Sequence, residues 1–318
     1  MIVVAGHLCL DILPALKSGT EIRPGLLVEA GRAQLSTGGA VSNVGLALDR
    51  LGMPVRLVGK VGNDQFGKIV LDILGAAELE NNIQIDRLRE TSYTVVVSPV
   101  GQDRTFLHCP GCNDTFVESD VPDAVLTGAK HLHFGYPPLM AAMSANYGNE
   151  LFTLLEKAKK KGLTTSLDMS LPDPNSASGK LDWKRILRNV LPLVDMFVPS
   201  EDELAFMLPN VDGAEALARA CAEMGAGVVV VKRGSLGLMG LKNGNILEVP
   251  CFSSNVVGTT GSGDATVAGF LYGVSHGFTF RESLVAGCAV GACSVESADA
   301  VSAIPNWEKV RTRFNLTR

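Results

Sequence analysis

The sequence predicts an α/β fold of three layers, in which helices cover both faces of a mostly parallel central sheet. Short apolar strands alternate with amphipathic helices along most of the chain, and the connections between them are short. Two glycine clusters, at 38–39 and 258–263, each lead into a helical pattern. A hairpin pattern near residue 100 departs from the alternation. We therefore expect one domain over residues 1–318 that carries a small β-sheet lid.

The first strand is expected at Val3–Gly6, and His7, Cys9 and Asp11 follow its carboxyl end. In an open α/β sheet, ligand groups collect at the carboxyl ends of the parallel strands. Asp11 is therefore a candidate for holding a polar ligand. An aspartate in an ordinary turn is the alternative interpretation.

The rest of the first half continues the rhythm and then breaks it. A helix opened and closed by glycine is expected at Gly38–Gly52, followed by a strand at 55–62 and a helix at 64–75. Residues 12–37 are irregular and rich in turn formers, and strands at 93–98 and 104–108 flank the turn at 99–103. We expect residues 12–37 and about 90–113 to form a lid that covers the site beside Asp11 and excludes water.

The second half returns to alternating strands and helices. Its strands are expected at 163–168, 194–198 and 227–232, with a terminal hairpin over 236–249, and its helices at about 146–161, 213–224, 264–276, 281–297 and 307–314. Asp168 ends one strand, Glu203 follows the next and Lys232 ends the third. These side chains should converge with Asp11 and the two glycine clusters.

Composition excludes several classes of protein. The formal net charge is −5, and the one dense basic run, Lys157–Lys161, is expected on the solvated end of a helix, so nucleic acid is not an expected partner. Apolar runs stay below the length of a membrane span, and Met1–Gly6 lacks the basic start of a signal peptide. The seven scattered cysteines fit a reducing compartment. We expect a cytoplasmic protein without a membrane partner.

Two motifs could indicate a metal but fit ordinary structure better. Cys109 and Cys112 form a C-x-x-C pair, yet no second pair stands at the spacing that a zinc site needs, and Pro-Gly between them is typical of a turn. His131 and His133 share one face of a strand, and the sequence offers no evident third ligand. We expect structural roles for all four side chains.

The glycine-rich loop at 258–264 is the strongest candidate for chemistry. Its three glycines allow backbone N–H groups to turn outward, where the positive end of the following helix dipole would favour an anion such as phosphate. Asp264 would lie in the first helical turn, where it could act as a general base. An ordinary tight turn with a favourable first-turn acid is the alternative.

Two stretches carry a resemblance to a known family. Gly38–Gly52 continuing through Gly59–Gly67, together with Gly258–Asp264, resemble the motifs of the ribokinase-like family of carbohydrate and nucleoside kinases, of the phosphofructokinase-B type. The resemblance covers nearly the whole chain. It implies a kinase that uses ATP and Mg²⁺ to phosphorylate a sugar or nucleoside. The remaining alternative is a relative that binds ligand without turnover, whereas a dinucleotide oxidoreductase would need a G-x-G-x-x-G after the first strand.

The resemblance also implies roles for individual residues. Asp264 would be the catalytic base, and the amides of Gly261, Ser262 and Gly263 would form the anion hole. The substrate hydroxyl groups would be held by Asp11, Gly38, Gly39, Asn43 and Asn113. The nucleotide phosphates would be bordered by Lys232, Gly234, Gly237 and Thr260. Glu203 would help to place magnesium, largely through water, and the lid would also serve as the interface of a homodimer.

The chain departs from the family pattern at three places. Gly258 stands where many members have an aspartate that ligates a monovalent cation, so we hypothesise weak or absent activation by potassium, which a several-fold rate gain with potassium would contradict. Ser200 replaces the asparagine of the Asn-x-x-Glu motif, which alters the expected magnesium network. The Asp-x-Asn-x-Arg motif keeps only its aspartate, Asp168, which leaves the role of that region open.

Overall fold

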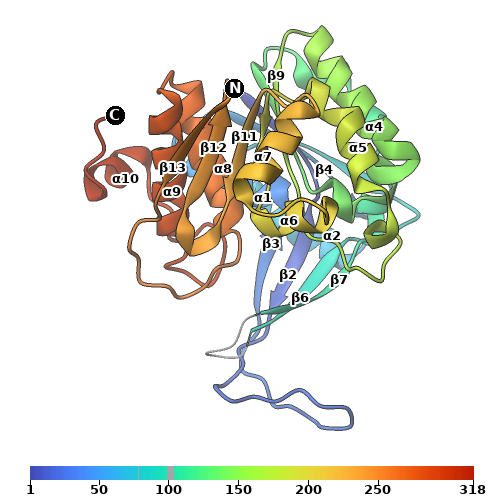
Figure 1. The fold of residues 1–318 in the computed structure, drawn as a ribbon. Coiled ribbons are helices and arrows are strands. Elements are labelled where there is room, and N and C mark those ends of the chain that lie inside the picture. The colour runs from blue at the N-terminus through green and yellow to red at the C-terminus, as the bar shows by residue number, and fades with distance from the viewer. Residues whose placement is uncertain (78, 99–103) are drawn as a thin grey trace.

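The computed structural model describes residues 1–77, 79–98 and 104–318, and within them it confirms the three-layer α/β fold. Figure 1 shows the large sheet between two groups of helices, with a smaller sheet projecting below it. The large sheet has nine strands in the order β13-β12-β11-β10-β9-β8-β1-β4-β5. Its strands are β1 (Ile2–Gly6), β4 (Val55–Gly62), β5 (Glu80–Asp86), β8 (His131–Gly135), β9 (Thr164–Asp168), β10 (Met196–Phe197), β11 (Val228–Lys232), β12 (Leu238–Lys242) and β13 (Asn245–Val249).

All neighbouring strands from β11 to β5 are parallel, whereas β12 is antiparallel to both of its neighbours, β11 and β13. The parallel strands therefore bring their carboxyl ends to one edge of the sheet. Asp168 ends β9, Lys232 ends β11, and Tyr136 directly follows β8. Ligand groups of open parallel sheets gather at this edge.

Alternation along the strands explains why both faces of the sheet are covered. In β1, Val3 and Ala5 belong to one core, and Ile2 and Val4 belong to the other. Successive side chains of a strand point to opposite faces, and all four of these residues are apolar and buried. An apolar strand of this kind needs helices on both sides.

The helices agree with the sequence predictions within a few residues. The core that contains Val3 and Ala5 is covered by α4 (Ala141–Lys160), α5 (Trp183–Val190), α6 (Glu201–Met207) and α7 (Ala214–Glu223). The core that contains Ile2 and Val4 is covered by α1 (Ala40–Arg50), α2 (Gln65–Gly75), α8 (Ser262–Ser275), α9 (Phe280–Ser294) and α10 (Trp307–Arg313). Strand β5 and helices α5 and α6 were not predicted. The predicted helix at 146–161 corresponds to the second part of α4, whose backbone is kinked at 145–148.

The small sheet has the order β3-β2-β6-β7 and consists of β2 (Cys9–Leu13), β3 (Gln34–Gly38), β6 (Tyr93–Val97) and β7 (Thr105–Cys109). Figure 1 shows the segment between β2 and β3 at its far end. The prediction of a separate sheet is confirmed, but residues 12–37 contain strand structure that appeared irregular in sequence. The predicted turn at 99–103 lies outside the described residues.

One boundary prediction was wrong. Because β2 begins at Cys9, the second sheet starts before residue 12, and Cys9 and Asp11 lie in a strand instead of a loop after β1. The mixed sequence Cys-Leu-Asp-Ile-Leu hides this strand, since its partners β3 and β6 come from distant parts of the chain. No helix in the described ranges combines the length and apolar character that a membrane span requires.

Candidate active site

The amino end of α8 lies at the centre of the candidate site. Its N-cap, Gly261, has φ of 72°, and a Cβ at this position would lie 2.1 Å from the Cβ of Ala300, so the turn requires glycine. No side chain caps the helix. The amides of Ser262 and Ala265 bond to the carbonyls of Thr259 and Gly261. Among the described residues, the amides of Gly263 and Asp264 have no hydrogen-bond partner, which leaves donors for an anion.

Asp264 is buried in the first turn of α8, and two donors fix its carboxylate. The Asn43 amide donates to Oδ2 over 2.9 Å, and the Tyr136 hydroxyl donates to Oδ1 over 2.6 Å. Asn43 comes from α1, and Tyr136 follows β8 with a left-handed backbone, φ 70°. Three distant segments of the chain therefore orient one carboxylate.

The surroundings of Asp264 suit a group that exchanges protons. Burial raises its pKa, and the hydrogen bonds from Tyr136 and Asn43 and the charge of Lys232 oppose that rise. A buried carboxylate with a raised pKa and a fixed orientation is typical of a general base.

The amino end of α1 lies beside Asp264 and is also opened by glycine. A Cβ on Gly38 would lie 2.3 Å from the Asp11 carboxylate, and a Cβ on Gly39, whose φ is 85°, would lie 2.5 Å from Nδ1 of His7. The two glycines thus allow the Asp11 and His7 side chains to pack against the backbone of the helix start. The amide of Val41 donates to the carbonyl of His7.

Asp11 is nearly buried and belongs to a short chain of polar contacts. The thiol of Cys9 donates to its Oδ1 over 3.3 Å, and Cys9 also contacts the Thr94 hydroxyl at 3.7 Å. Burial raises the pKa of Asp11 to about 6, and the charge of Asp264 adds to the rise. Asp11 and Asp264 are therefore close enough to repel each other.

Asn113 is the predicted substrate ligand whose position fits that role least. It is fully buried, its amide group donates to the Leu8 carbonyl over 2.9 Å, and its Oδ1 accepts from the Leu8 amide at 3.3 Å. Both ends of the side chain amide are occupied by one residue of the link between β1 and β2. Asn113 therefore positions that link, and its contact with substrate stays a prediction.

Lys232 and Asp168 form a buried ion pair at the carboxyl ends of β11 and β9. Nζ of Lys232 lies 2.6 and 2.7 Å from the two carboxylate oxygens. Burial lowers the pKa of Lys232, but the charges of Asp168, Glu203 and Asp264 outweigh it, so the net pKa is raised and the lysine stays charged. A Cβ on Gly263 would lie 3.5 Å from this Nζ, so a fixed cation borders the amino end of α8.

Glu203 also lies within this charged cluster, in the first turn of α6. Its Oε2 accepts from the Ser200 amide over 2.6 Å, and the Ser200 hydroxyl accepts from the Glu203 amide over 3.2 Å. The pair forms a capping box, so Ser200 replaces asparagine without loss of the helix cap. Across the described ranges, no group of three or more acidic, histidine or cysteine side chains could hold a metal.

The remaining predicted residues border the same edge. Gly234 and Gly237 form the turn after β11, with φ of 54° and 84°. Thr260 is partly buried immediately before Gly261. A Cβ on Gly258 would lie 2.8 Å from the Ser297 carbonyl, so a larger residue would need the backbone to shift.

The sequence did not point to Tyr136 or His108 as residues of the site, and it gave His7 only as a residue that follows the first strand. Tyr136 was not considered, although the rule that strand ends carry ligand groups applies to it. His7 and His108 have ring centroids 5.1 Å apart, and His7 and Tyr136 lie 6.0 Å apart. His108 comes from β7, and no local pattern connects it to His7.

The comparison with known proteins decides the family. Residues 1–307 match the pfkB family of carbohydrate kinases. The chain belongs to this family. Probable fructokinase-7 of Arabidopsis thaliana is 27% identical over 330 residues, covering 100% of this chain and 93% of the relative. The fructokinase of Klebsiella pneumoniae is 29% identical, covering 86% and 91%.

Solved structures show the same fold at lower identity. Ribokinase from Thermotoga maritima matches this pfkB-family chain with a TM-score of 0.80 and 22% identity, covering 99% of both chains. A putative ribokinase II from E. coli in complex with ATP and Mg²⁺ matches with a TM-score of 0.79 and 24% identity, covering 99% and 98%. The family is one of phosphotransferases with an alcohol group as acceptor, which is therefore the class of this enzyme.

The side chains that first suggested a metal have other partners in this pfkB-family chain. Ser166 bridges two strand residues, since its hydroxyl lies 2.7 Å from Nε2 of His131 and 2.8 Å from Nδ1 of His133. Burial lowers the pKa of both histidines, that of His131 to about 4. Cys109 and Cys112 are free thiols, and Cys112 is buried.

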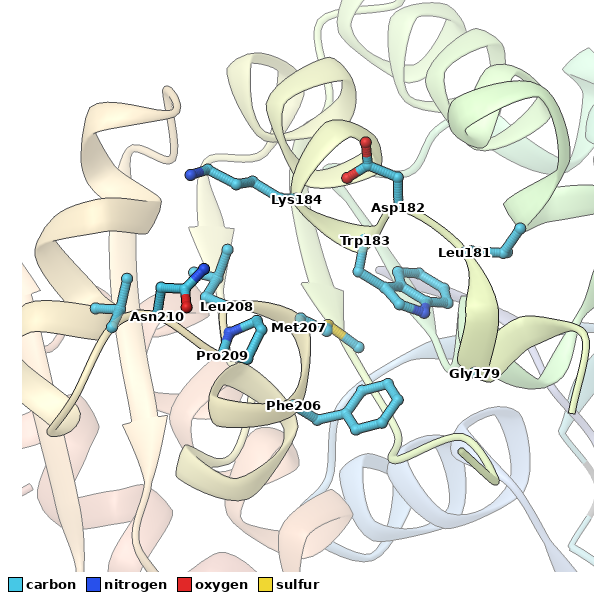
Figure 2. Close-up of a pocket in the computed structure, with 11 residues that line it drawn as sticks. Gly179, Leu181, Asp182, Trp183, Lys184, Phe206, Met207, Leu208, Pro209 and Asn210 are labelled. Atoms are coloured by element: carbon cyan, nitrogen blue, oxygen red, sulfur yellow. The ribbon is translucent and has the colours of Figure 1, made fainter. Parts of the chain in front are cut away.

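A cavity of about 410 Å³ lies away from the pfkB motifs. Figure 2 shows its lining side chains, which come from the start of α5 and the end of α6 with the following loop. The Trp183 indole donates to the Ser178 carbonyl, and the Asp182 carboxylate caps α5. Its polar groups thus serve local structure, and none of the predicted site residues lines it.

Proposed function

We propose that this pfkB-family enzyme transfers the γ-phosphoryl group of ATP to a hydroxyl group of a sugar or sugar-like substrate, with Asp264 as the base. The observation that carries the proposal is the buried Asp264 carboxylate, fixed by Asn43 and Tyr136 in the first turn of a helix with two unpartnered amides. The base and an anion site thus lie within one helical turn, which is the arrangement that phosphoryl transfer needs.

In the proposed reaction, the acceptor oxygen forms a bond to the γ-phosphorus while the bond from that phosphorus to the bridging oxygen of ADP breaks. Asp264 takes the proton of the acceptor hydroxyl. The unpartnered amides of Gly263 and Asp264 stabilise the charge on the transferred group, and the amides of Gly261 and Ser262 complete the anion hole once the Ser262 amide leaves the Thr259 carbonyl. Asn43 and Tyr136 keep the carboxylate pointed at the acceptor.

The nucleotide side of the site fits a polyphosphate. Lys232 supplies a fixed positive charge next to Gly263, and the turn at Gly234 and Gly237, together with Thr260, borders the same edge. The side chains around Glu203 lack the donor set for a protein-held metal, so Mg²⁺ would be held chiefly by nucleotide phosphates and water, with Glu203 ordering that water. The metal would neutralise phosphate charge during transfer.

On the acceptor side, Asp11, Gly38, Gly39 and Asn43 lie around the amino end of α1 and would hold substrate hydroxyl groups. Tyr136 gives this side an aromatic wall, which keeps a nucleoside as the second candidate acceptor. A protein that only bound ligand would not need the hydrogen bonds from Asn43 and Tyr136 that fix the Asp264 carboxylate.

The variant Asp264→Asn tests the mechanism. We expect turnover to fall by at least about 10³-fold, because the amide cannot accept the proton, while acceptor binding stays within a few-fold. Asp202→Asn, at an exposed acid in the first turn of α6, is the matched control and should keep full activity. Near-normal turnover of Asp264→Asn would refute the assignment. Measuring ADP release with ATP, Mg²⁺ and a panel of sugars and nucleosides identifies the acceptor.

The small sheet is proposed as a lid and as the interface of a homodimer. Large apolar side chains are exposed on β7, with Leu107 at 58% and Phe106 at 48%, and on the segment between β2 and β3, with Leu27 at 94%. A second copy of the chain would cover them. Sedimentation should give a dimer that Leu107→Glu dissociates, and a monomeric wild-type protein at micromolar concentration would contradict this.

A further inference from the structure

Two histidines near the acceptor side have ring nitrogens without partners. His7 is only 2% exposed, and within the described structure neither Nδ1 nor Nε2 has a hydrogen-bond partner. Nε2 of His108 is also buried and unpartnered, while its Nδ1 lies 3.0 Å from the Thr94 hydroxyl. A buried polar atom without a partner costs free energy, so three such atoms together call for an explanation.

The two rings belong to a chain of contacts that connects the two carboxylates of the site. Contacts run from Asp264 through Tyr136 to the His7 ring and then to the His108 ring. From His108 they continue through Thr94 and Cys9 to Asp11. The unpartnered nitrogens therefore border the place where the acceptor must bind if Asp264 is the base.

We propose that His7 and His108 determine acceptor specificity, by exchanging hydrogen bonds with hydroxyl groups of a neutral polyol and by disfavouring acceptors that carry a carboxylate or phosphate. This inference rests on the proposed kinase function, because it places the acceptor beside Asp264. It assigns to two residues a role that the sequence motifs do not contain.

The charge state of the two rings supports a neutral ligand. Burial lowers the pKa of His7 well below its ordinary value, with the His108 ring adding to the effect, and burial lowers the pKa of His108 to about 4. Each ring is therefore neutral near pH 7 and offers one N–H donor and one bare acceptor nitrogen. A hydroxyl group both donates and accepts, so it can satisfy either nitrogen. A carboxylate or phosphate dianion only accepts, so it can bind the N–H of a ring but leaves the bare nitrogen without a partner.

The charges around the rings act in the same direction. Asp11 and Asp264 are the acidic groups of this side, and the charge of Asp264 already adds to the raised pKa of Asp11. Lys232 is paired with Asp168. Arg104 contacts the Thr259 hydroxyl in the catalytic loop and lies over the Phe106 ring, 5.4 Å from its centroid. An anionic acceptor would need Arg104 as its positive partner. A preference for anionic acceptors that depends on Arg104 would therefore be the result opposite to our proposal.

Backbone packing also holds His7 in place. A Cβ on Gly39 would lie 2.5 Å from both Nδ1 and the carbonyl oxygen of His7, so the ring sits directly against the opening of α1. Its own carbonyl accepts from Val41. A ring fixed in this way cannot turn to find other partners, so the ligand or a trapped water must supply them.

The first experiment compares two neutral acceptors, fructose and ribose, with two anionic acceptors, fructose 6-phosphate and gluconate. With ATP and Mg²⁺ we expect kcat/KM for the better neutral sugar to exceed that of either anion by at least about 100-fold. Binding without nucleotide can be measured as the shift in melting temperature with about 10 mM of each acceptor. These shifts should rank the acceptors in the same order as kcat/KM does.

The second experiment removes the nitrogens and keeps the ring volume. His7→Phe and His108→Phe should each raise KM for the neutral acceptor by about tenfold or more, while KM for ATP changes by less than about twofold. His7→Gln, which keeps a donor and an acceptor, should recover part of the loss. His276→Phe, at an exposed histidine in the C-cap of α8, is the matched control and should change neither constant.

Two results would overturn the inference. One is preferred phosphorylation of an anionic acceptor that Arg104→Gln abolishes. The other is an unchanged acceptor KM in both phenylalanine variants, which would mean that a trapped water satisfies the rings. Failure of the proposed function is a different result, with no ADP release from any acceptor. In that case the melting shifts alone decide whether neutral polyols bind through His7 and His108.

Discussion

The two helices that open on glycine, α1 and α8, begin alike and differ in what fills their amino ends. Both have an N-cap glycine with positive φ, 85° at Gly39 and 72° at Gly261, and neither has a side-chain cap. At α1, the His7 carbonyl accepts from the first turn and the His7 ring packs on the cap. At α8, the amides of Gly263 and Asp264 stay without partners in the described structure, and an acid stands in the first turn.

This difference shows how one local motif can serve two purposes. Helix α8 presents backbone N–H groups, which suit the charge of a phosphoryl group. Their position depends on the glycine-containing turn, so side chains that disturb this turn are not tolerated. Helix α1 presents side chains from its surroundings, which can be exchanged to suit different acceptors. We therefore expect damage at α8 to lower kcat and damage at α1 to raise the KM of the acceptor.

Replacing Gly261 by alanine should have the largest effect. The positive φ costs about 1–2 kcal/mol, and the new Cβ would overlap Ala300, so the amides of the first turn must move. We expect kcat to fall by about 100-fold or more, with acceptor binding within a few-fold. Gly277→Ala, after the end of α8, has a similar φ of 70° and open space, so it isolates the cost of φ alone. Equal kinetic losses in both variants would contradict our interpretation of α8.

Replacing Gly39 by alanine should instead affect the acceptor. The Cβ would overlap Nδ1 and the carbonyl of His7, so the ring must move away from the helix start. We expect the acceptor KM to rise by about 10- to 100-fold and the ATP KM to stay within twofold. Gly52→Ala is the control, because its φ of 91° is as unusual but its surroundings are open. If the KM of ATP rose instead, α1 would contribute together with α8 to binding the nucleotide.

Tyr136→Phe should have a moderate effect, visible in the pH profile. The lost hydroxyl donates 2.6 Å to Asp264, and that hydrogen bond lowers the pKa of the base. Its removal therefore raises the pKa of Asp264, and the acidic limb of kcat/KM should move to higher pH. We expect about a tenfold loss of kcat at pH 6 and a smaller loss at pH 8. A uniform loss at all pH values would indicate a purely structural role for Tyr136.

Potassium should have the smallest effect. Gly258 offers no side-chain ligand, and a Cβ there would meet the Ser297 carbonyl at 2.8 Å. We expect ADP release to change by less than about twofold when potassium replaces a tetraalkylammonium salt at equal ionic strength. An increase of several-fold would show that backbone carbonyls suffice to hold the cation.

The sequence could predict whatever depends on local pattern. The β-branched run at 228–231 and the glycines before α1 and α8 specify strands and helix starts by themselves. Strands β2 and β5 escaped because their mixed residues are recognisable only beside their partners. In a strand that covers a site instead of a core, apolar and polar residues need not alternate strictly.

The same limit applies to the site. Asp264 could be singled out as the candidate base because it and its glycines are contiguous in sequence. The pairing of Lys232 with Asp168, and the contact between His7 and His108, join residues that are 64 and 101 positions apart (232 − 168 and 108 − 7). The structural role of Asn113 could not be predicted, because an amide near a substrate site and an amide that holds a loop look identical in sequence.

The link from β1 to β2 is only His7 and Leu8, because β1 ends at Gly6 and β2 begins at Cys9. Asn113 holds Leu8 by both its N–H and its C=O, so this passage from the large sheet to the small one is firmly fixed. An acceptor that engages His7 in the proposed way would therefore contact the link itself and order the proposed lid before the nucleotide arrives. We expect an ordered kinetic mechanism with the acceptor binding first, and initial-rate patterns with a dead-end acceptor analogue test that order.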